Sequence, residues 1–295
     1  MAEIGKVAVI GGGLMGSGIA EVSAKAGYET LLREVNDDFA QKARARIEKS
    51  LGRAVDKGKL DAADRDAALG RLSFTTELGD LAEAGIVIEA ITEQLDLKRE
   101  IFGKLDGLCG PEAIFASNTS SLTIVDMAAA TKRPDRMVGL HFFNPVPVMK
   151  LVEVVRTIAT SDEAFRAAFD FARSLGKEPI VAKDTSGFIV NRLLVPYMLD
   201  AIRGLDAGLG SVADIDKGMT LGTGYPMGPF VLGDFVGLDT LHAIAEIMFD
   251  EFRETRFAPP PLLTRMISMG YYGRKSGKGF YDYTGESPVV NDLGL

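Results

Sequence analysis

The sequence predicts an α/β protein with a doubly wound, mostly parallel sheet, followed by a C-terminal all-helical domain. Two observations predict this fold class. Short apolar runs alternate with helical patterns in the first part of the chain, and that order implies right-handed crossovers and a parallel sheet. After Gly187 the pattern is helical, apart from a strand-like stretch at residues 279–283. We therefore expect one domain over residues 1–185 and a second over residues 186–295.

Each strand of the first domain is predicted from a short apolar run. These runs cover residues 6–10, 29–34, 86–91, 113–116, 136–140, 151–155 and 179–182. Helices are predicted at residues 14–26, 37–58, 61–69 and 163–175. The second and third form a helical hairpin insertion near residues 37–70, with an apolar face made by Phe39, Ala43, Ile47, Leu51 and Ala54. Helices of the second domain are predicted at residues 188–207, 211–220, 237–254 and 260–269, with a loop at 222–229.

Composition excludes several classes of protein. The 295 residues carry 41 acidic and 33 basic side chains, a net charge of −8 that disfavours general nucleic-acid binding. The single cysteine, Cys109, cannot form an intramolecular disulfide or a thiolate metal cluster, so we expect no metal and a reducing compartment. No apolar run is long enough for a membrane span, and strand-like sequence from Lys6 leaves no room for a targeting peptide. We expect a cytoplasmic protein.

A glycine-rich motif marks a nucleotide site. Gly11-Gly-Gly13-Leu14-Met15-Gly16 fits G-x-G-x-x-G, follows a predicted strand and opens a predicted helix. Gly11 allows the tight turn, Gly13 lets the backbone approach a pyrophosphate, and Gly16 lets helix and strand pack closely. The helix N-terminus offers free N–H groups to phosphates. A Rossmann-type dinucleotide-binding domain is therefore expected, the alternative being a glycine-rich turn without a ligand.

Glu34 predicts the choice of dinucleotide. It ends the second strand, 18 residues after Gly16. A carboxylate there accepts hydrogen bonds from a ribose diol and repels a 2′-phosphate, so NAD(H) is favoured. Neighbouring Arg33 is suited to a 2′-phosphate, so NADP(H) stays as the alternative.

Candidate chemical groups follow two later strands. Residues 116–122 carry hydroxyls and an amide at a strand end, where they can bind a substrate or cap a helix. His141 lies just past the predicted strand at 136–140, and an imidazole titrates near neutrality, as a base for a hydroxyl proton must. Glu153 lies within an apolar strand, where a carboxylate is costly unless it is paired. Pairing with His141 would orient the imidazole, unless Glu153 faces solvent on an edge strand. For His242 we expect a packing or surface role.

Six motifs in order carry a family resemblance. They are residues 11–16, 117–121, 141–147, 184–192, 224–230 and 277–281. Together they resemble the L-3-hydroxyacyl-CoA dehydrogenases, and the bacterial 3-hydroxybutyryl-CoA dehydrogenases in particular. The resemblance covers essentially the whole chain. It implies reversible hydride transfer between NAD(H) and a short-chain 3-hydroxyacyl-CoA/3-oxoacyl-CoA pair.

The resemblance also implies roles for individual residues. His141 would be the general acid/base with Glu153 as its partner, and Ser120 and Asn191 would hydrogen-bond the substrate oxygen. Further cofactor contacts would come from Glu93, Lys98, Ser120, Asn144 and Lys275, and coenzyme A contacts from Ser50 and Lys57. Seven residues are two helical turns, so Ser50 and Lys57 face the same side. The family often has Asp where this chain has Glu34, which keeps the acid on a longer side chain.

Two other functions stay open from the sequence. One is a sugar-acid dehydrogenase of the same architecture, as in gulonate dehydrogenases, which a test of coenzyme A dependence would separate. The other is a non-enzymatic, crystallin-like protein, which a His141→Ala comparison would separate. The family is usually dimeric, and residues 188–208 are strongly apolar. We therefore expect a homodimer formed through the C-terminal helical domain, the alternative being that this face packs internally.

Overall fold

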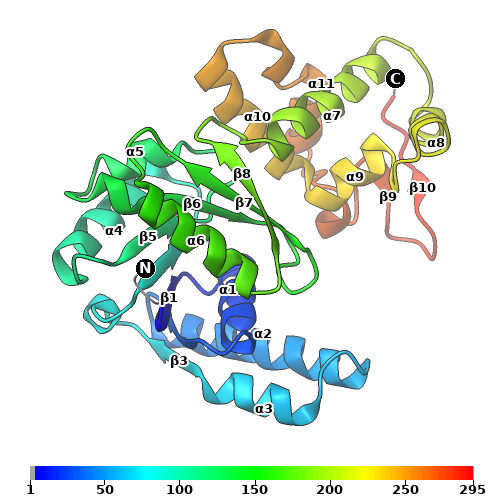
Figure 1. Ribbon diagram of the computed structural model, residues 1–295. Coiled ribbons are helices and arrows are strands. Elements are labelled where there is room, and N and C mark those ends of the chain that lie inside the picture. The colour runs from blue at the N-terminus through cyan, green and yellow to red at the C-terminus, as the bar shows by residue number, and fades with distance from the viewer. Residues whose placement is uncertain (1–3, 295) are drawn as a thin grey trace. The chain divides into compact units, whose positions relative to one another are not determined.

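The computed structural model describes residues 4–294 and divides the chain into two compact units (Figure 1). The first unit ends at Phe188 and the second begins at Ile189. The fold class predicted from the sequence is confirmed, because the first unit holds a mostly parallel sheet with helices and the second is mainly helical.

An eight-stranded sheet forms the centre of the first unit, in the order β3-β2-β1-β4-β5-β6-β7-β8. Neighbouring strands are parallel, except that β7 runs antiparallel to β6. The order reverses between β1 and β4, and doubly wound sheets bind ligands outside the carboxyl ends of the strands at such a point. The strands are β1 (Lys6–Ile10), β2 (Glu29–Arg33), β3 (Leu72–Thr75), β4 (Ile86–Glu89), β5 (Ile114–Ser117), β6 (Met137–Phe142), β7 (Leu151–Arg156) and β8 (Glu178–Lys183).

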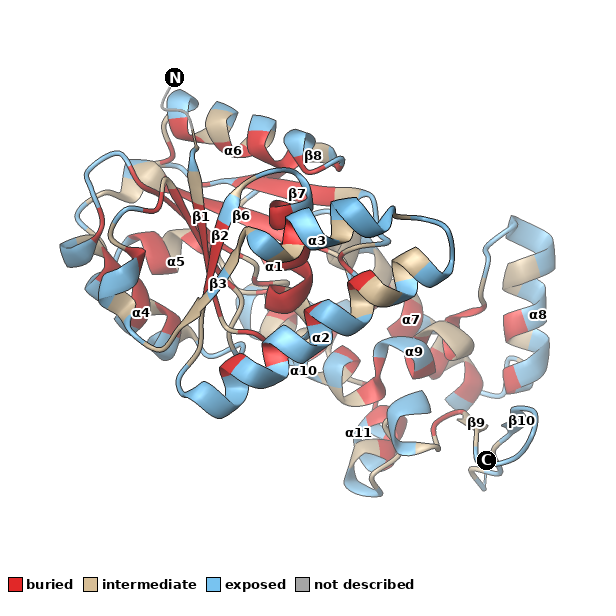
Figure 2. Ribbon diagram, turned by 90° about the horizontal axis from the view of Figure 1, so that it is seen from below, coloured by how far each residue is buried: buried red, intermediate tan, exposed pale blue. Residues whose placement is uncertain are grey.

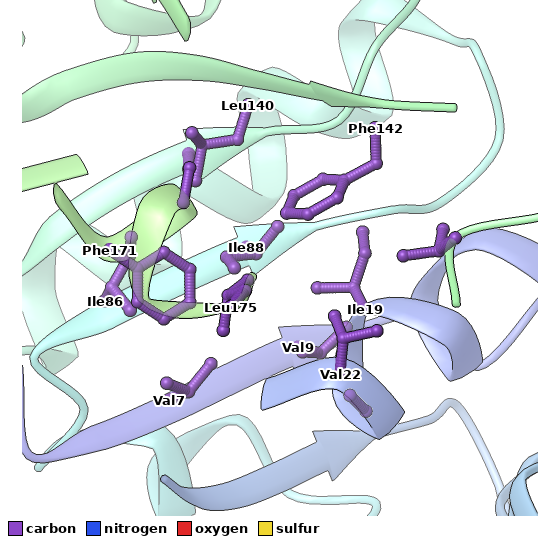
Figure 3. Packing of buried hydrophobic residues seen from close by; sticks show 14 of the residues in the cluster. Val7, Val9, Ile19, Val22, Ile86, Ile88, Leu140, Phe142, Phe171 and Leu175 are labelled. Carbon is purple, nitrogen blue, oxygen red and sulfur yellow. The ribbon is translucent and has the colours of Figure 1, made fainter. Parts of the chain in front are cut away.

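Helices cover both faces of this sheet, which is why its central strands are mostly apolar. One face packs on α1, α2, α3 and α6, and the other on α4, α5 and the short η1. Figure 3 shows Val9 of β1 beside Ile19 and Val22 of α1 on the first face. The helices are α1 (Leu14–Lys25), α2 (Asp37–Asp56), α3 (Ala62–Gly70), η1 (Leu78–Leu81), α4 (Leu95–Leu108), α5 (Ile124–Ala128), η2 (Pro134–Arg136) and α6 (Asp162–Ser174).

The hairpin of α2 and α3 is only partly buried. Ala43, Ile47 and Leu51 of α2 are in the core, one helical turn apart, whereas the opposite face of the helix is exposed (Figure 2). Phe39 was expected on the buried face but is 46% exposed, because the buried row of α2 begins at Ala40 and Phe39 lies to the outer side of it. The first turn of α2 is capped by Asn36, whose side chain accepts from the Phe39 N–H at 2.9 Å.

One strand of the first unit was not predicted, and two others differ from the sequence prediction by two residues at one end. The edge strand β3 was not predicted, because its period-two pattern covers only four residues. β6 continues to Phe142, so His141 lies within the strand rather than past it, held by pairing with β7. The strand predicted to reach residue 91 ends at Glu89, where the Ile91 N–H donates to the Glu89 carboxylate at 2.7 Å instead of continuing the ladder.

The second unit packs five helices around its own apolar core. The sequence predicts a loop at residues 222–229 but no helix at 230–236, where α9 lies. Pro229 is its first residue, a position where proline suits a helix. The strand expected at 279–283 is shorter and pairs with a second, unpredicted strand. The elements are α7 (Val190–Asp206), α8 (Val212–Thr223), α9 (Pro229–Val236), α10 (Leu238–Phe252), η3 (Thr255–Phe257), α11 (Pro261–Ser268), η4 (Arg274–Ser276), β9 (Tyr281–Asp282) and β10 (Val289–Val290).

Two buried carboxylates organise this second unit. Asp216 accepts from the Phe230 N–H at 2.8 Å, in the first turn of α9, and from the Tyr281 hydroxyl at 2.8 Å. Asp234 accepts from the Phe280 and Tyr281 N–H groups at 3.0 and 2.9 Å. Burial raises the pKa of both carboxyls, and these hydrogen bonds offset only part of that rise. A Cβ on Gly279 would overlap the Asp234 carboxylate, which explains the glycine.

Among residues 4–294, no helix is long and apolar enough to cross a membrane. Within the same range, no group of three or more His, Cys, Asp or Glu side chains could hold a metal ion. His242 packs in α10, with Nε2 3.1 Å from the Thr264 hydroxyl and Nδ1 3.3 Å from Glu246.

Candidate active site

The glycine loop has the geometry that a bound pyrophosphate needs. Gly11 has a φ of +93°, and a Cβ there would lie 2.8 Å from the Ala90 carbonyl oxygen. A Cβ on Gly16 would overlap the Gly11 carbonyl oxygen. Gly13 has nothing within 4 Å of a Cβ position, so the loop is open on that side. Leu14 and Met15 begin α1, whose N-terminus carries no side-chain cap and leaves N–H groups for an anion.

Gly12, the middle glycine of the loop, is hydrogen-bonded at both its N–H and its carbonyl group. The sequence did not predict these contacts. The Gly12 N–H donates to Glu34 Oε1 at 2.5 Å, and the Gly12 carbonyl accepts from Arg46 Nη1 at 2.6 Å and from the Ser17 hydroxyl at 2.7 Å. A Cβ on Gly12 would lie only 2.5 Å from the Ala43 Cβ, so α2 packs directly on the loop. No local pattern predicts these contacts, because they join residues up to 34 positions apart.

At the end of β2, Glu34 and Arg33 point to different partners. Glu34 is half-buried at the glycine loop, and its Oε2 also accepts from the Val35 N–H at 2.9 Å. The Arg33 Nε donates to the Thr76 carbonyl at 3.1 Å, at the end of the neighbouring β3. The Glu34 carboxylate therefore lies against the glycine loop, whereas the Arg33 guanidinium is hydrogen-bonded at the end of β3.

Glu93 binds the loop that follows β5. Its Oε1 accepts from the Thr119 hydroxyl and from the Ser120 N–H, the latter at 2.9 Å, and Lys98 Nζ lies 3.3 Å from its Oε2. Burial raises the pKa of Glu93, but the Lys98 charge and these hydrogen bonds outweigh it, so the pKa is lowered. The carboxylate is thus held ionised and fixes the backbone of Ser120. The structure thus brings together three residues that were predicted to contact the cofactor, namely Glu93, Lys98 and Ser120.

Beneath this loop lies a buried ion pair. Lys98 Nζ is 2.6 Å from Glu89 Oε1, and the two side chains are 1% and 0% exposed. The Ser117 hydroxyl donates to the other carboxylate oxygen of Glu89 at 2.6 Å. The sequence analysis missed Glu89, although a carboxylate that ends an apolar run is itself a signal of a buried, paired charge.

His141 and Glu153 are paired across two strands. They are directly opposite each other in the register of β6 and β7, and His141 Nδ1 lies 2.6 Å from Glu153 Oε2. Both residues are buried. The Glu153 carboxylate accepts a hydrogen bond from Nδ1–H, which leaves Nε2 as the nitrogen available to a reacting group. An imidazole oriented in this way can act as a general acid or base.

The carboxyl edge of the sheet brings the two halves of the site side by side. β5 and β6 are parallel neighbours, so the loop of Ser120 and the strand end of His141 meet at the same edge. The Asn118 side-chain oxygen accepts from the Phe142 N–H at 2.9 Å and links the two segments. Asn144 is exposed on the loop after β6.

The other predicted contact residues lie elsewhere in the chain. Lys57 is exposed at the end of α2. Ser50 is hydrogen-bonded to buried Glu21 of α1, whose pKa is raised by burial and only partly lowered by Ser50. Asn191 is in the first turn of α7, and Lys275 pairs with Asp239 at 2.5 Å. Asn191 and Lys275 belong to the second unit, so their approach to the residues above stays a prediction.

The sheet, the glycine loop and the His141–Glu153 pair define a dinucleotide-binding oxidoreductase. Two family models match the chain. The NAD binding domain of 3-hydroxyacyl-CoA dehydrogenase matches residues 6–185, and the C-terminal domain of the same enzyme matches residues 187–283. The chain belongs to the 3-hydroxyacyl-CoA dehydrogenase family, so the resemblance seen in the sequence is confirmed.

Named relatives cover almost the full length of the chain. It is 53% identical to a 3-hydroxybutyryl-CoA dehydrogenase of Mycobacterium tuberculosis over 282 residues, which are 95% of this chain and 99% of that protein. It is 46% identical to the human mitochondrial hydroxyacyl-coenzyme A dehydrogenase, over 94% of this chain and 90% of that protein. The crystal structure of (S)-3-hydroxybutyryl-CoA dehydrogenase from Ralstonia eutropha matches with a TM-score of 0.93 at 44% identity, over 96% of this chain and all of that one.

Proposed function

We propose that this chain catalyses reversible hydride transfer between NAD(H) and a short-chain 3-hydroxyacyl-CoA/3-oxoacyl-CoA pair, namely 3-hydroxybutyryl-CoA and acetoacetyl-CoA. The buried His141–Glu153 pair at the ligand edge of a dinucleotide fold carries this proposal. The relatives' printed names support the substrate class.

His141 moves the proton of the reaction. In oxidation its Nε2 takes the proton of the substrate hydroxyl, and in reduction the protonated imidazole returns it. Glu153 fixes the Nδ1–H tautomer and stabilises the imidazolium through the 2.6 Å contact. Since oxidation releases a proton, a rise in pH shifts the equilibrium toward the 3-oxoacyl product.

Ser120 and Asn191 hydrogen-bond the substrate oxygen, which develops charge during the transfer. The Ser120 backbone is already fixed by Glu93, so its hydroxyl needs little rearrangement. Lys57 meets a phosphate of coenzyme A, for which an exposed ammonium at a helix end is suited, and Ser50 lies on the same face of α2.

The dinucleotide supplies or accepts the hydride at its nicotinamide ring. The open face of Gly13 and the uncapped N-terminus of α1 fit its pyrophosphate. Glu34 fits the ribose diol, and Arg33 is engaged by Thr76, so we propose NAD(H) rather than NADP(H). Glu93, Lys98, Asn144 and Lys275 are proposed as its further contacts.

The proposed function is tested by the nicotinamide absorbance during acetoacetyl-CoA reduction, with NADH and NADPH in parallel. We expect rapid loss of absorbance with NADH and much slower loss with NADPH. The matched variant Glu34→Gln removes the charge that repels a 2′-phosphate and should raise the relative rate with NADPH. Faster loss with NADPH in the parent chain would refute the role given to Glu34. No loss with either dinucleotide, including with longer acyl chains, would refute the substrate class and favour a sugar acid.

We also propose a homodimer formed through the second unit. Leu193 of α7 is 69% exposed, and four further large apolar side chains of the same unit are 50% to 79% exposed, namely Leu209, Leu221, Phe235 and Met269. Sedimentation at micromolar concentration is expected to give twice the chain mass of 31.6 kDa. A particle of the single-chain mass would contradict the dimer, and Leu193→Glu should weaken it if α7 contributes.

A further inference from the structure

The segment 184–188, which leads into the second unit, is tied to the active-site loops at three points. Both carboxylate oxygens of Asp184 accept from the first turn of α5, from the Ile124 and Val125 N–H groups at 2.7 Å. The buried Ser186 hydroxyl donates to the Ser121 carbonyl at 2.8 Å. The ring of Phe188 lies 5.6 Å from the imidazole of His141, between centroids. This segment therefore contacts the loop of Ser120 as well as His141.

Phe188 has an unusual backbone conformation. Its φ is +46°, in the left-handed region that a bulky side chain rarely adopts, and it follows Gly187, which has a φ of +78° without the same cost. The Phe188 N–H donates to the Thr185 carbonyl at 2.9 Å and closes the turn. The side chain is only 4% exposed. A strained backbone conformation of this kind is kept only where the surrounding contacts fix it, and such positions are common at functional sites.

The conformation places an aromatic ring against the catalytic imidazole. His141 is held at one atom by Glu153, and a tilt of the ring plane lengthens that hydrogen bond and weakens its hold on the Nδ1–H tautomer. Phe143 and Phe188 restrict this tilt. Their ring centroids lie 4.5 and 5.6 Å from that of His141, with interplanar angles of 50° and 55°. Phe143 follows His141 by two residues, whereas Phe188 comes from a separate segment and is placed there by the strained turn.

We propose that Phe188 is a positioning residue for His141: the strained turn at 187–188 places its ring against the imidazole, so that Nε2 is aimed at the substrate oxygen. The inference rests on the proposed role of His141 as general acid/base. It predicts that changes at Phe188 alter the proton-transfer step more than dinucleotide binding.

The experiment compares Phe188→Leu and Phe188→Met with Phe188→Tyr and with Phe102→Leu. Phe102 is a matched control, since its fully buried ring lies in the same apolar cluster and packs on Phe115. Each full-length variant is assayed for acetoacetyl-CoA reduction and for NADH affinity by fluorescence titration. The chain has only two histidines, so ¹⁵N-histidine NMR, assigned with His242→Gln, reports the tautomer of His141 directly.

We expect Phe188→Leu and Phe188→Met to lower kcat about tenfold, with the NADH dissociation constant within about twofold of the parent value. Their His141 ¹⁵N shifts should move from a single Nδ1–H tautomer toward a mixture. Phe188→Tyr should retain most of the turnover, and Phe102→Leu should keep the parent tautomer whatever it does to thermal stability.

Parent-like kcat and tautomer in the folded Phe188 variants would overturn the inference. So would the same changes in Phe102→Leu, because the effect would then belong to core packing in general. His141→Ala is included to separate this result from a failure of the proposed function. If that variant retains full turnover, the role of His141 itself is wrong; if it is inactive while the Phe188 variants are normal, only the positioning role is wrong.

Discussion

Glu153→Gln is expected to lower kcat for acetoacetyl-CoA reduction by about 10²–10⁴-fold, while the dissociation constant for NADH stays within about twofold. The Glu153 side chain is fully buried and lies 2.6 Å from His141 Nδ1, so its charge acts on the imidazole with little screening by water. The amide is nearly isosteric but neutral. It no longer stabilises the imidazolium, and it can donate to Nδ1, which would put the proton of the neutral ring on the wrong nitrogen.

Steady-state absorbance and NADH fluorescence measure the two quantities. Glu178→Gln is the matched control, since Glu178 is an exposed acid at the start of the neighbouring strand β8. That variant should keep the parent turnover. If Glu153→Gln and Glu178→Gln turn over equally fast, Glu153 has no part in the proton transfer.

A second large effect is expected at the buried ion pair beneath the Ser120 loop. Glu89→Gln removes the partner that lies 2.6 Å from the Lys98 ammonium, which is 1% exposed, and leaves it only the longer 3.3 Å contact with Glu93. Removing one member of a buried pair costs about 3–5 kcal/mol of unfolding free energy. For a domain of 150–250 residues, each kcal/mol lowers Tm by about 2–4 °C, so we expect a decrease of roughly 6–20 °C.

The double variant Glu89→Gln/Lys98→Met separates charge from packing. It removes both charges, and exchange of a buried pair for apolar groups is often nearly neutral, so most of the lost Tm should return. Glu100→Gln is the control on the same helix, because its pair with Lys104 is exposed and should leave Tm unchanged. A single variant as stable as the parent would show that Lys98 does not depend on Glu89.

Helices and strands were predicted best where a local pattern of apolar side chains was sufficient to specify them. The strand β1 was predicted at its observed bounds, because Lys6 is followed by four apolar residues, 7–10, that end at a glycine turn. β3 and α9 were missed for opposite reasons. β3 is a four-residue edge strand with too short a pattern, and α9 follows a Gly- and Pro-rich stretch typical of a loop, although Pro229 is a good first residue of a helix.

The candidate site could be predicted only as far as its motifs extend. The glycine loop, Ser120, His141 and Glu153 are marked by residue type and position at strand ends. Arg46 at the Gly12 carbonyl and Glu21 at Ser50 have no such signal, because each contact depends on how α2 packs on α1 and its loop. The role of Phe188 depends on a φ angle, which no side-chain pattern specifies.

The antiparallel pairing of β6 and β7 has a consequence for how such a protein can diversify. The hydrogen-bonded ladder, not the connecting loop, sets the spacing of His141 and Glu153. Insertions or deletions within residues 145–150, after Phe143 and Asn144, would therefore leave the two side chains opposite each other, whereas a slip of one residue in the ladder would turn one of them to the far face of the sheet. The spacing of the reactive pair is thus independent of the length of the segment that connects β6 and β7, so that length can vary without rebuilding the proton-transfer pair.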